Sequence, residues 1–239
     1  MDDLEKILED RKNDPRWNTS YPLSPDDWKQ YRVTGPLSFD GDKELSFYIH
    51  IPFCERLCSF CEYTRMLCPS KGLQESYVAT IEHDVASFIE RYPALRLCGL
   101  DVGGGTPTVL CDDAFDRLMD LCRRTMSISD KSEDFTPSIE ATFDTLTEQK
   151  IKALVASGFK RVSLGVQSTS ENVLACNHRK GQGTEDMKKT ISMLYENGVD
   201  IVNLDMMYGL NCQTVDSLHR DVQILAYLQP EQVTLYELR

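Results

Sequence analysis

The residues best suited to chemistry are three cysteines that lie close together in the chain. Cys54, Cys58 and Cys61 follow the spacing C-x3-C-x2-C. Thiolates hold the irons of a cuboidal iron–sulfur cluster, which normally takes four of them. With only three thiolates, one iron keeps a free coordination position, as a catalytic zinc ion does. We therefore predict a [4Fe–4S] cluster whose open iron can bind a chelating ligand and pass it an electron.

A zinc site or a set of unrelated thiols would agree less well with the spacing of these cysteines. A zinc knuckle would need Cys68 or His50 as a fourth ligand, but structural zinc usually takes paired ligands separated by a helix or loop. Three unrelated buried thiols would need no regular spacing. The remaining cysteines show no such pattern, and we interpret them as structural. They are Cys68, Cys98, Cys111, Cys122, Cys176 and Cys212.

Composition and charge exclude several functional classes. The 239-residue chain has a formal net charge of −12 and an isoelectric point near 4.8, which argues against a nucleic-acid surface because phosphate binding needs clustered Lys and Arg. No apolar run approaches the roughly 18 residues of a membrane span. The first residues, MDDLEKILEDRKND, are too charged for a secretory signal. Nine cysteines without such a signal indicate a reducing compartment, with metal-binding or buried thiols rather than disulfides. We therefore predict a cytoplasmic protein.

Two regions of the chain differ in their pattern. Residues 1–44 form a polar N-terminal leader, punctuated by proline, with a short helix expected at Asp3–Lys12. From 45 to 239, short β-type runs alternate with longer helical stretches, which predicts parallel βα units in one core domain. The expected strands are Leu45–Ile51, Leu97–Gly103, Pro137–Phe143, Lys160–Gln167, Asp200–Met207 and Gln232–Leu238. The expected helices are Leu73–Arg91, Asp112–Met126, Thr147–Ser157, Glu185–Asn197 and Thr214–Tyr227. Gly158 and Gly198 follow two of these helices, where a left-handed cap is expected.

Within the expected strands, apolar residues alternate with small or polar ones. The apolar positions include Leu45, Phe47, Cys98, Leu100, Ile139, Val162, Leu164, Val202, Val233 and Leu235, and the opposite positions include Tyr48, His50, Gly103, Glu140, Gln167 and Asp205. One face can bury against helices, while the other would curve around a hydrophilic interior, unlike the apolar interior of a closed eight-stranded barrel. We predict an α/β fold, an open partial (β/α)6 TIM-like barrel with a polar ligand inside. Helix-length connections disfavour the alternative, an antiparallel sheet with one solvated face.

Six segments of the chain together resemble one protein family. They are FYIHIPFCERLCSFC, DVGGGTPTVL, IEATFD, GFKRVSLGVQS, NLDMMYGL and LYELR. C-x3-C-x2-C after a first strand is the signature of the radical S-adenosylmethionine (SAM) superfamily. In their order, the six segments resemble the oxygen-independent coproporphyrinogen III oxidases and their haem-chaperone and methyltransferase-like relatives. The resemblance runs from Leu45 to Arg239, and it implies that the chain stops after the sixth strand, before the family's last barrel helix and C-terminal domain.

The resemblance implies a role for each matching residue. Cys54, Cys58 and Cys61 would bind three irons, and the amine and carboxylate of SAM would chelate the fourth. Tyr48 would lie against the cluster and cofactor, and His50 would lie near a second ligand or substrate, so these two are the catalytic candidates; a purely hydrogen-bonding His50 is equally consistent. The residues expected to contact SAM, besides Tyr48, are Gly103, Gly104, Gly105, Thr106, Glu140, Gln167, Arg179 and Asp205. Glycines at a strand end let backbone amides approach a charged ligand closely.

The activity implied by the resemblance is reductive cleavage of SAM. A reduced cluster would donate one electron to the sulfonium, releasing methionine and a 5′-deoxyadenosyl radical that takes hydrogen from an organic substrate. A porphyrinogen is the first candidate substrate, with an electron donor such as flavodoxin or ferredoxin and with one or two molecules of SAM. The alternatives are a haem-binding chaperone of the same family without turnover, and a radical SAM methyltransferase or cyclase.

Two positions depart from the coproporphyrinogen oxidase pattern. These oxidases typically carry another cysteine two residues after the third cluster ligand, where this chain has Tyr63. The usual Pro-Gly after the YGL motif is replaced by Asn211 and Cys212. Decarboxylation of coproporphyrinogen is therefore one hypothesis, and haem binding without turnover is the other.

Overall fold

The computed structural model describes residues 44–128 and 130–238, and the predicted leader with its helix at Asp3–Lys12 lies outside these ranges. The main sheet runs in the order β1-β4-β6-β7-β8-β9, with β5 also paired to β4, and every neighbouring pair is parallel. The strands are β1 (Glu44–Ile51), β4 (Arg96–Gly104), β5 (Asp130–Lys131), β6 (Ser138–Ala141), β7 (Arg161–Gln167), β8 (Ile201–Tyr208) and β9 (Gln232–Glu237). Since β1 and β9 do not pair, the sheet is open, as predicted for a partial barrel.

All five predicted helices are confirmed to within two residues at each end. The helices are α3 (Lys71–Arg91), α4 (Asp112–Ile128), α5 (Glu148–Ala156), α6 (Glu171–Cys176), α7 (Thr184–Glu196) and α8 (Val215–Leu228), with a 3-10 turn η2 (Pro107–Val109). Thr147 caps α5 by accepting a hydrogen bond from the Lys150 amide, because the first turn of a helix leaves its N–H groups unpaired. Gly158 and Gly198 follow α5 and α7 with φ of +99° and +96°, as expected of left-handed caps. The short α6 and the two-residue strands were not predicted, since none spans enough residues to show a period.

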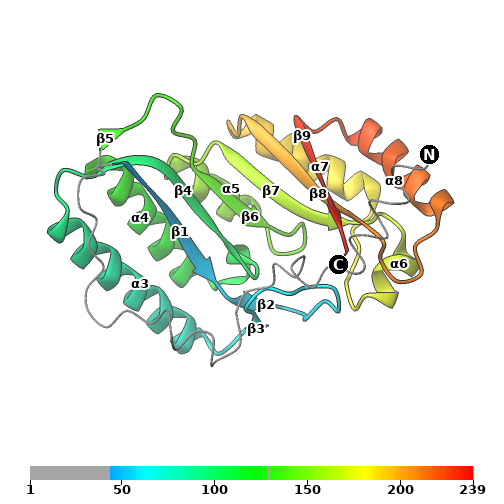
Figure 1. The fold of residues 1–239 in the computed structure, drawn as a ribbon, viewed down its shortest axis with the longest axis horizontal. Coiled ribbons are helices and arrows are strands. Elements are labelled where there is room, and N and C mark those ends of the chain that lie inside the picture. Colours follow the sequence, from blue (N-terminus) through cyan, green and yellow to red (C-terminus); the bar gives the residue numbers. More distant parts are fainter. Residues whose placement is uncertain (1–43, 129, 239) are drawn as a thin grey trace, which may run out of the picture. The chain divides into compact units, whose positions relative to one another are not determined.

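The core lies between one face of the sheet and the helices, which cover that face in Figure 1. On this face Leu100, Ile139 and Leu164 are completely buried. The helices supply the other half of the core; their buried residues include Val78, Phe115, Leu118, Ile151, Leu154, Ile191 and Leu194. The predicted apolar face is therefore the helix-covered one, and burial of its side chains is the main favourable term in folding. Among the described residues, no helix combines the length and the apolar character needed to cross a bilayer.

Two parts of the predicted apolar face are wrong. Cys98 is exposed, because the pairing of β1 with β4 shifts between Leu45 and Ser46, so that Leu97 takes the buried position instead. Val233 and Leu235 are 43% and 56% exposed. They lie on β9, which has a neighbouring strand on one side only, and they do not belong to the core that the described residues form.

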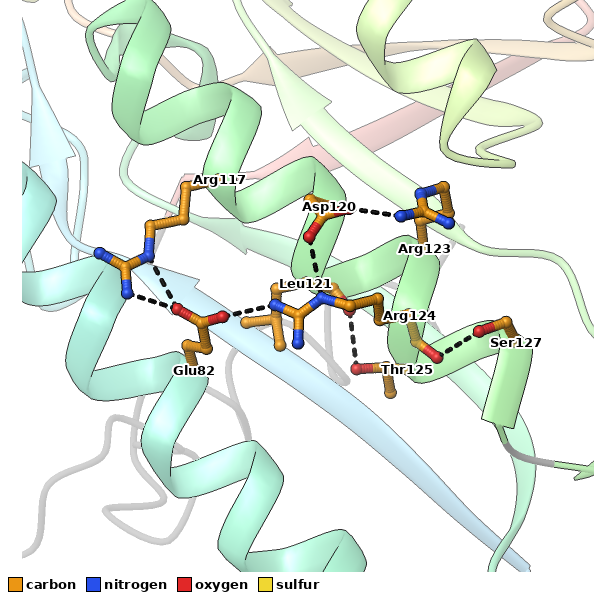
Figure 2. Close-up of polar contacts among 8 residues, drawn as sticks. All are labelled: Glu82, Arg117, Asp120, Leu121, Arg123, Arg124, Thr125 and Ser127. Atoms are coloured by element: carbon orange, nitrogen blue, oxygen red, sulfur yellow. Dashed lines mark hydrogen bonds and ion pairs between the residues drawn. The ribbon is translucent and has the colours of Figure 1, made fainter.

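A network of charged side chains joins α3 and α4 (Figure 2). Glu82 of α3 accepts hydrogen bonds from Arg117 and Arg124 of α4, the first at 2.7 Å, and Arg124 also donates to Asp120 at 2.8 Å. Hydrogen bonding to Arg117, more than to Arg124, lowers the pKa of Glu82. Ion pairs of this exposed kind contribute little each to stability. The network therefore orients α3 on α4 rather than holding the fold together.

Candidate cluster-binding site

The three cysteines lie on a loop that is closed at its base. This segment, Pro52–Cys68, is called the cysteine loop below. At its base β2 (Phe53–Cys54) pairs in parallel with β3 (Met66–Leu67). The amide of Met66 donates to the Pro52 carbonyl at 2.7 Å. Inside the loop, the Arg65 guanidinium donates to the Cys58 carbonyl at 2.9 Å. The loop therefore has internal hydrogen bonds of its own, and it directly follows the C-terminal end of β1.

The thiols themselves have polar neighbours that suit metal-bound sulfur. The hydroxyl of Thr106 lies 4.0 Å from the Cys54 sulfur, and the guanidinium of Arg179 lies 3.7 Å from the Cys58 sulfur. Burial raises the pKa of the Cys54 thiol, and the hydrogen bond from Thr106 opposes this shift. Coordination to a metal removes the thiol proton outright, so the raised pKa does not prevent ligation.

The arrangement of donors favours a cluster over a single zinc ion. Among residues 44–128 and 130–238, no three His, Cys, Asp or Glu side chains converge on one point to hold a metal ion. Both candidates for a fourth zinc ligand have other partners: His50 pairs through Nε2 with the Thr64 carbonyl at 2.8 Å, and the Cys68 sulfur accepts from Gln74 at 3.2 Å. In a cluster each thiolate binds a different iron, so the sulfurs surround the group instead of sharing one metal ion. The cysteine loop, with Thr106 beside Cys54 and Arg179 beside Cys58, suits the predicted [4Fe–4S] group in the kinds of residues it carries.

Gly103–Thr106, called the glycine loop below, lie at the end of β4 and pack directly against the cysteine loop. The amide of Gly105 donates to the Ile51 carbonyl and the amide of Thr106 to the Phe53 carbonyl, both at 2.8 Å. A β-carbon on Gly105 would lie only 2.8 Å from the Cys54 sulfur. Gly104 has a φ of +114° and faces the His50 ring, which a β-carbon would approach to 2.6 Å. These positions exclude larger residues, because any side chain would push the two loops apart.

Tyr48, Gly103 and Glu140 meet on the open face of the sheet. A β-carbon on Gly103 would come within 2.7 Å of both the Tyr48 hydroxyl and the Glu140 carboxyl. Glu140 accepts a hydrogen bond from the Gly104 amide at 3.1 Å. Solvent reaches Glu140, yet the surrounding protein raises the pKa of its carboxyl, an effect that the Gly104 amide opposes. Burial, with the nearby Glu140 charge, raises the pKa of Tyr48 to about 12. At neutral pH this group therefore combines a hydroxyl donor with a carboxyl acceptor.

Gln167, Arg179 and Asp205 form a second group on the same face. Arg179 donates to the Gly165 carbonyl, and a β-carbon on Gly165 would lie 2.9 Å from Arg179 and 3.0 Å from the Gln167 amide nitrogen. Asp205 accepts from Asn203 at 2.8 Å. Burial raises the pKa of Asp205, while Asn203 and the two guanidinium groups nearby lower it. The group pairs a fixed cation with a carboxylate, as a zwitterionic ligand requires.

A hollow lies between the cysteine loop and Arg179 of the second group. Its lining includes Cys54, Cys58, Thr106 and Arg179 together with Thr142, Asp144 and Lys180. The structure places the predicted site residues in the C-terminal halves of β1, β4, β6, β7 and β8 or in the loops that follow these strands. Two residues that line the hollow were not predicted from the sequence. Strand alternation does place Thr142 on the inward side, whereas Lys180 lies on a loop and carries no such signal. The role of each residue toward the cofactor stays a prediction.

The expectation of metal-binding or buried thiols in place of disulfides is wrong for two cysteines, because Cys176 and Cys212 form a disulfide. Cys176 ends α6 and Cys212 follows β8, and the two segments also meet where the Asn177 side chain donates to the Asn211 carbonyl at 3.0 Å. The Ser59 amide of the cysteine loop donates to the Asn177 carbonyl at 3.1 Å. The disulfide therefore ties the segment that leads to Arg179 to its neighbouring loop. The 36-residue separation of the pair gave no signal in the sequence.

Comparison with known proteins agrees with this site. The sequence pattern of the Radical SAM superfamily matches residues 48–223. Heme chaperone HemW of Bacillus subtilis is 31% identical over 193 residues, which cover 81% of this chain and 50% of that protein. Coproporphyrinogen III oxidase, anaerobic 1, of Cereibacter sphaeroides is 31% identical over 232 residues, covering 93% of this chain and 49% of that protein.

A solved structure extends the comparison to three dimensions. Coproporphyrinogen III oxidase (HemN) from Escherichia coli, described as a radical SAM enzyme, superposes with a TM-score of 0.75 at 29% identity, covering 83% of this chain and 45% of that one. The chain spans about half the length of the curated relatives it matches. Members of the superfamily use a [4Fe–4S] cluster and SAM. Since the family match includes the cysteine loop, the glycine loop and most of the sheet, this chain belongs to the radical SAM superfamily.

Proposed function

We propose that this chain is the cluster- and SAM-binding core of a radical SAM enzyme that acts on a porphyrinogen, with an activity most like that of the oxygen-independent coproporphyrinogen III oxidases. One observation carries the proposal. The glycine loop packs on Cys54 while Arg179 reaches Cys58, and a hollow remains between them. A zwitterionic ligand that enters this hollow meets the thiols of Cys54 and Cys58, the Arg179 guanidinium for its carboxylate and the Asp144 carboxylate for a cationic group.

Each residue of the site has a distinct task in this proposal. When bound, the cluster and SAM supply the one-electron cleavage of a carbon–sulfur bond. Cys54, Cys58 and Cys61 hold the cluster, and Arg179 orients the carboxylate of the methionine moiety. Glu140 accepts hydrogen bonds from the amine. Burial raises the pKa of the Glu140 carboxyl, and the positive charge of a bound amine would oppose that shift. The glycines leave room for the ligand beside the cysteine loop.

Anaerobic reconstitution of the full chain tests the proposal. We expect about four irons and four sulfides per chain, and 5′-deoxyadenosine on addition of SAM, a reductant and coproporphyrinogen III. Cys58→Ser should lose both the iron and the nucleoside. Cys98→Ser, at an exposed cysteine outside the site, is the matched control and should retain both. Absence of iron and sulfide in the reconstituted wild-type chain would contradict the proposal.

A haem carrier is the second candidate, and Tyr63 is the observation that favours it. Tyr63 is 67% exposed on the cysteine loop, at the position where coproporphyrinogen oxidases typically have a cysteine. One of the similar proteins is named as a heme chaperone. A carrier should change the absorption spectrum of added haem and release little 5′-deoxyadenosine, whereas the enzyme should turn over without haem. The two measurements on one preparation distinguish the candidates.

The electron donor and the location belong to the same proposal. We assign a cytoplasmic protein that takes electrons from flavodoxin or ferredoxin. Support for a docking protein comes from large apolar side chains on the cysteine loop, where Leu57, Met66 and Leu67 are 41%, 45% and 57% exposed. Exposed apolar side chains that lie together are typical of protein-binding surfaces. Reduction of the cluster by each donor, followed spectroscopically in wild type and in Leu67→Ser, tests this part.

A further inference from the structure

One buried carboxylate lies behind the site and has no part in the function proposed so far. Asp221 on α8 is completely buried. Its oxygens accept hydrogen bonds from the Ser168 hydroxyl at 3.0 and 3.2 Å, from the Thr169 amide at 2.6 Å and from the Thr169 hydroxyl at 2.6 Å. A buried charge is tolerated only when it is well hydrogen-bonded. Here all the donors come from two consecutive residues, so the carboxylate is dedicated to holding that pair.

The two residues that Asp221 holds follow directly on Gln167, which ends β7. Gln167 has a φ of +69°, a backbone conformation that side chains other than glycine rarely adopt. The Ser168 amide donates across it to the Val166 carbonyl at 2.9 Å. A three-residue turn with positive φ at its centre is the rare and strained form of the γ-turn. Such strain persists only where the surroundings enforce it, and the four contacts of Asp221 are the enforcing ones.

The turn decides where the Gln167 side chain lies. The pairing of β7 with β8 shifts between Gly165 and Gln167, so Gln167 has left the regular ladder. Its amide nitrogen lies over Gly165, next to the Arg179 guanidinium. Asp221 is on the helix-covered side of this turn, and Gln167 projects to the open side. A relaxed turn would move the Gln167 amide away from Arg179 without touching Arg179 itself.

We infer that Asp221 is a positioning residue of the SAM site: by anchoring Ser168 and Thr169 it enforces the left-handed turn at Gln167 and so holds the Gln167 amide beside Arg179. The inference rests on the proposed function only in that Gln167 contacts SAM. A purely structural Asp221 would stabilise the chain without any specific effect on Gln167. The two roles therefore differ in the coupling between Asp221 and Gln167.

The first test measures binding of SAM to the anaerobically reconstituted protein. Gln167→Ala should raise the Kd of SAM by about tenfold, the effect of one lost hydrogen bond. Asp221→Asn, which keeps the shape of the side chain but places an amide nitrogen against the donors, should raise it about fivefold. The double variant should bind SAM no more weakly than Gln167→Ala alone. Once the Gln167 side chain is absent, relaxing the turn removes no further contact with SAM. Asp216→Asn, at an exposed position on the same helix, should bind as wild type does.

The second test needs neither cluster nor SAM. It measures the strain of the turn at Gln167 through the melting temperature of the protein. Gln167→Gly should raise the melting temperature in the wild-type background, because glycine adopts positive φ without strain. In the Asp221→Asn background the same change should give no rise, because the turn is no longer enforced. If Asp221→Asn does not fold, Thr169→Val removes one donor and takes its place in both tests.

The outcomes separate this inference from the proposed function. A protein that binds no SAM defeats the proposed function, but the melting-temperature cycle still reports on the turn. Loss of the glycine effect in the Asp221→Asn background supports the inference. Melting-temperature effects of Asp221→Asn and Gln167→Gly that simply add, or a Kd for SAM in Asp221→Asn equal to that of wild type, would overturn it.

Discussion

The two faces of the parallel sheet come from alternate residues of the same strands, yet their environments are opposite. On the helix-covered face, Ile139 and Leu164 are completely buried. On the open face, Tyr48 is 56% exposed and Glu140 is reached by solvent. Neighbours in sequence thus belong to different environments, one dry and closely packed, the other polar and partly unpaired. Stability should depend on the first face and ligand binding on the second.

The open face is arranged for a ligand rather than for stability. Asn203 donates to Asp205 at 2.8 Å and to Ser163 at 3.3 Å, and it accepts from Thr234 at 2.9 Å. This network satisfies part of the polar surface, but Glu140 and Asp205 keep raised pKa values because burial disfavours their charges. Groups held in an unfavourable state are typical of functional sites. Removing them should therefore weaken binding and leave the fold intact.

The largest expected difference is between Leu164 and its neighbour Ser163 on β7. Leu164→Ala should lower the free energy of unfolding by about 3 kcal/mol, because it leaves a cavity in a fully buried position. Ser163→Ala should lower it by roughly 0.5 kcal/mol, since only the contact with Asn203 at 3.3 Å is lost. Urea denaturation of the two variants measures both values. Equal losses for the two would show that the faces are not energetically distinct.

The disulfide at the rim of the open face should have the next largest effect. Replacing Cys176 and Cys212 by serine should lower the free energy of unfolding by roughly 2 kcal/mol, because the denatured chain gains entropy when a 36-residue link is opened. The value is at the lower end of the usual range, since Asn177 and Asn211 still connect the two loops. Denaturation with and without a reducing agent measures it. A wild-type midpoint that does not respond to the reductant would contradict the disulfide.

The variant with serine at positions 176 and 212 is the control for this experiment. Without the two cysteines, the same reductant should leave the midpoint unchanged. Thiol counting under denaturing conditions gives an independent check, because the wild-type chain should show two fewer reactive thiols before reduction than after it.

Strand alternation was enough to predict most of the sheet, because burial of one face forces a period of two on the sequence. It failed at Cys98, where a shift in pairing with β1 moved the buried position to Leu97. A shift of this kind depends on the partner strand, so a single strand's pattern contains no trace of it. The failure at Val233 and Leu235 has a similar cause, since an edge strand has the same period whether or not anything covers it.

The residues of the candidate site also differ in whether a local sequence pattern could indicate them. The spacing of the cysteines predicted a shared loop, and alternation predicted that Glu140 and Asp205 lie on the open face, because both signals are local. Arg179 lies on a loop, and only the resemblance indicated it. Asp221 was not predicted at all, since a single carboxylate in a helix of mixed polarity is usually on the solvent side. Its burial depends on Ser168 and Thr169, which are more than fifty residues away.

One substitution at Glu140 should have opposite effects on ligand binding and on stability. Glu140→Gln should bind SAM at least tenfold more weakly, because a charged hydrogen-bond acceptor is lost. The same change should raise the free energy of unfolding of the ligand-free protein at pH 7, by less than about 1 kcal/mol because solvent reaches the group. The folded-state pKa of Glu140 is raised by burial, so the wild type loses stability as pH rises from the unfolded pKa through the folded one.

The pH dependence of the stability of this variant tests the direction of the Glu140 pKa shift. The difference in unfolding free energy between Glu140→Gln and wild type should grow between the unfolded pKa of a glutamate, about 4.3, and the folded value above it, and should then stay constant. Denaturation curves at a series of pH values measure this difference. A difference that shrinks with rising pH would mean that the folded protein favours the ionised carboxylate, so that the open face would stabilise this charge even without a ligand.

The smallest effect is expected at Arg117, which belongs to neither face of the sheet. Arg117→Ala should lower the free energy of unfolding by about 0.5 kcal/mol, because the ion pair with Glu82 is on the surface and Arg124 still pairs with that carboxylate (Figure 2). The loss should shrink further at high salt, since exposed charges are screened. Denaturation at low and high ionic strength measures both effects. Because Arg117 pairs with Glu82 and not with a residue of the proposed SAM site, SAM affinity should not change. A change in affinity would show that the helices outside the sheet also help to position the site.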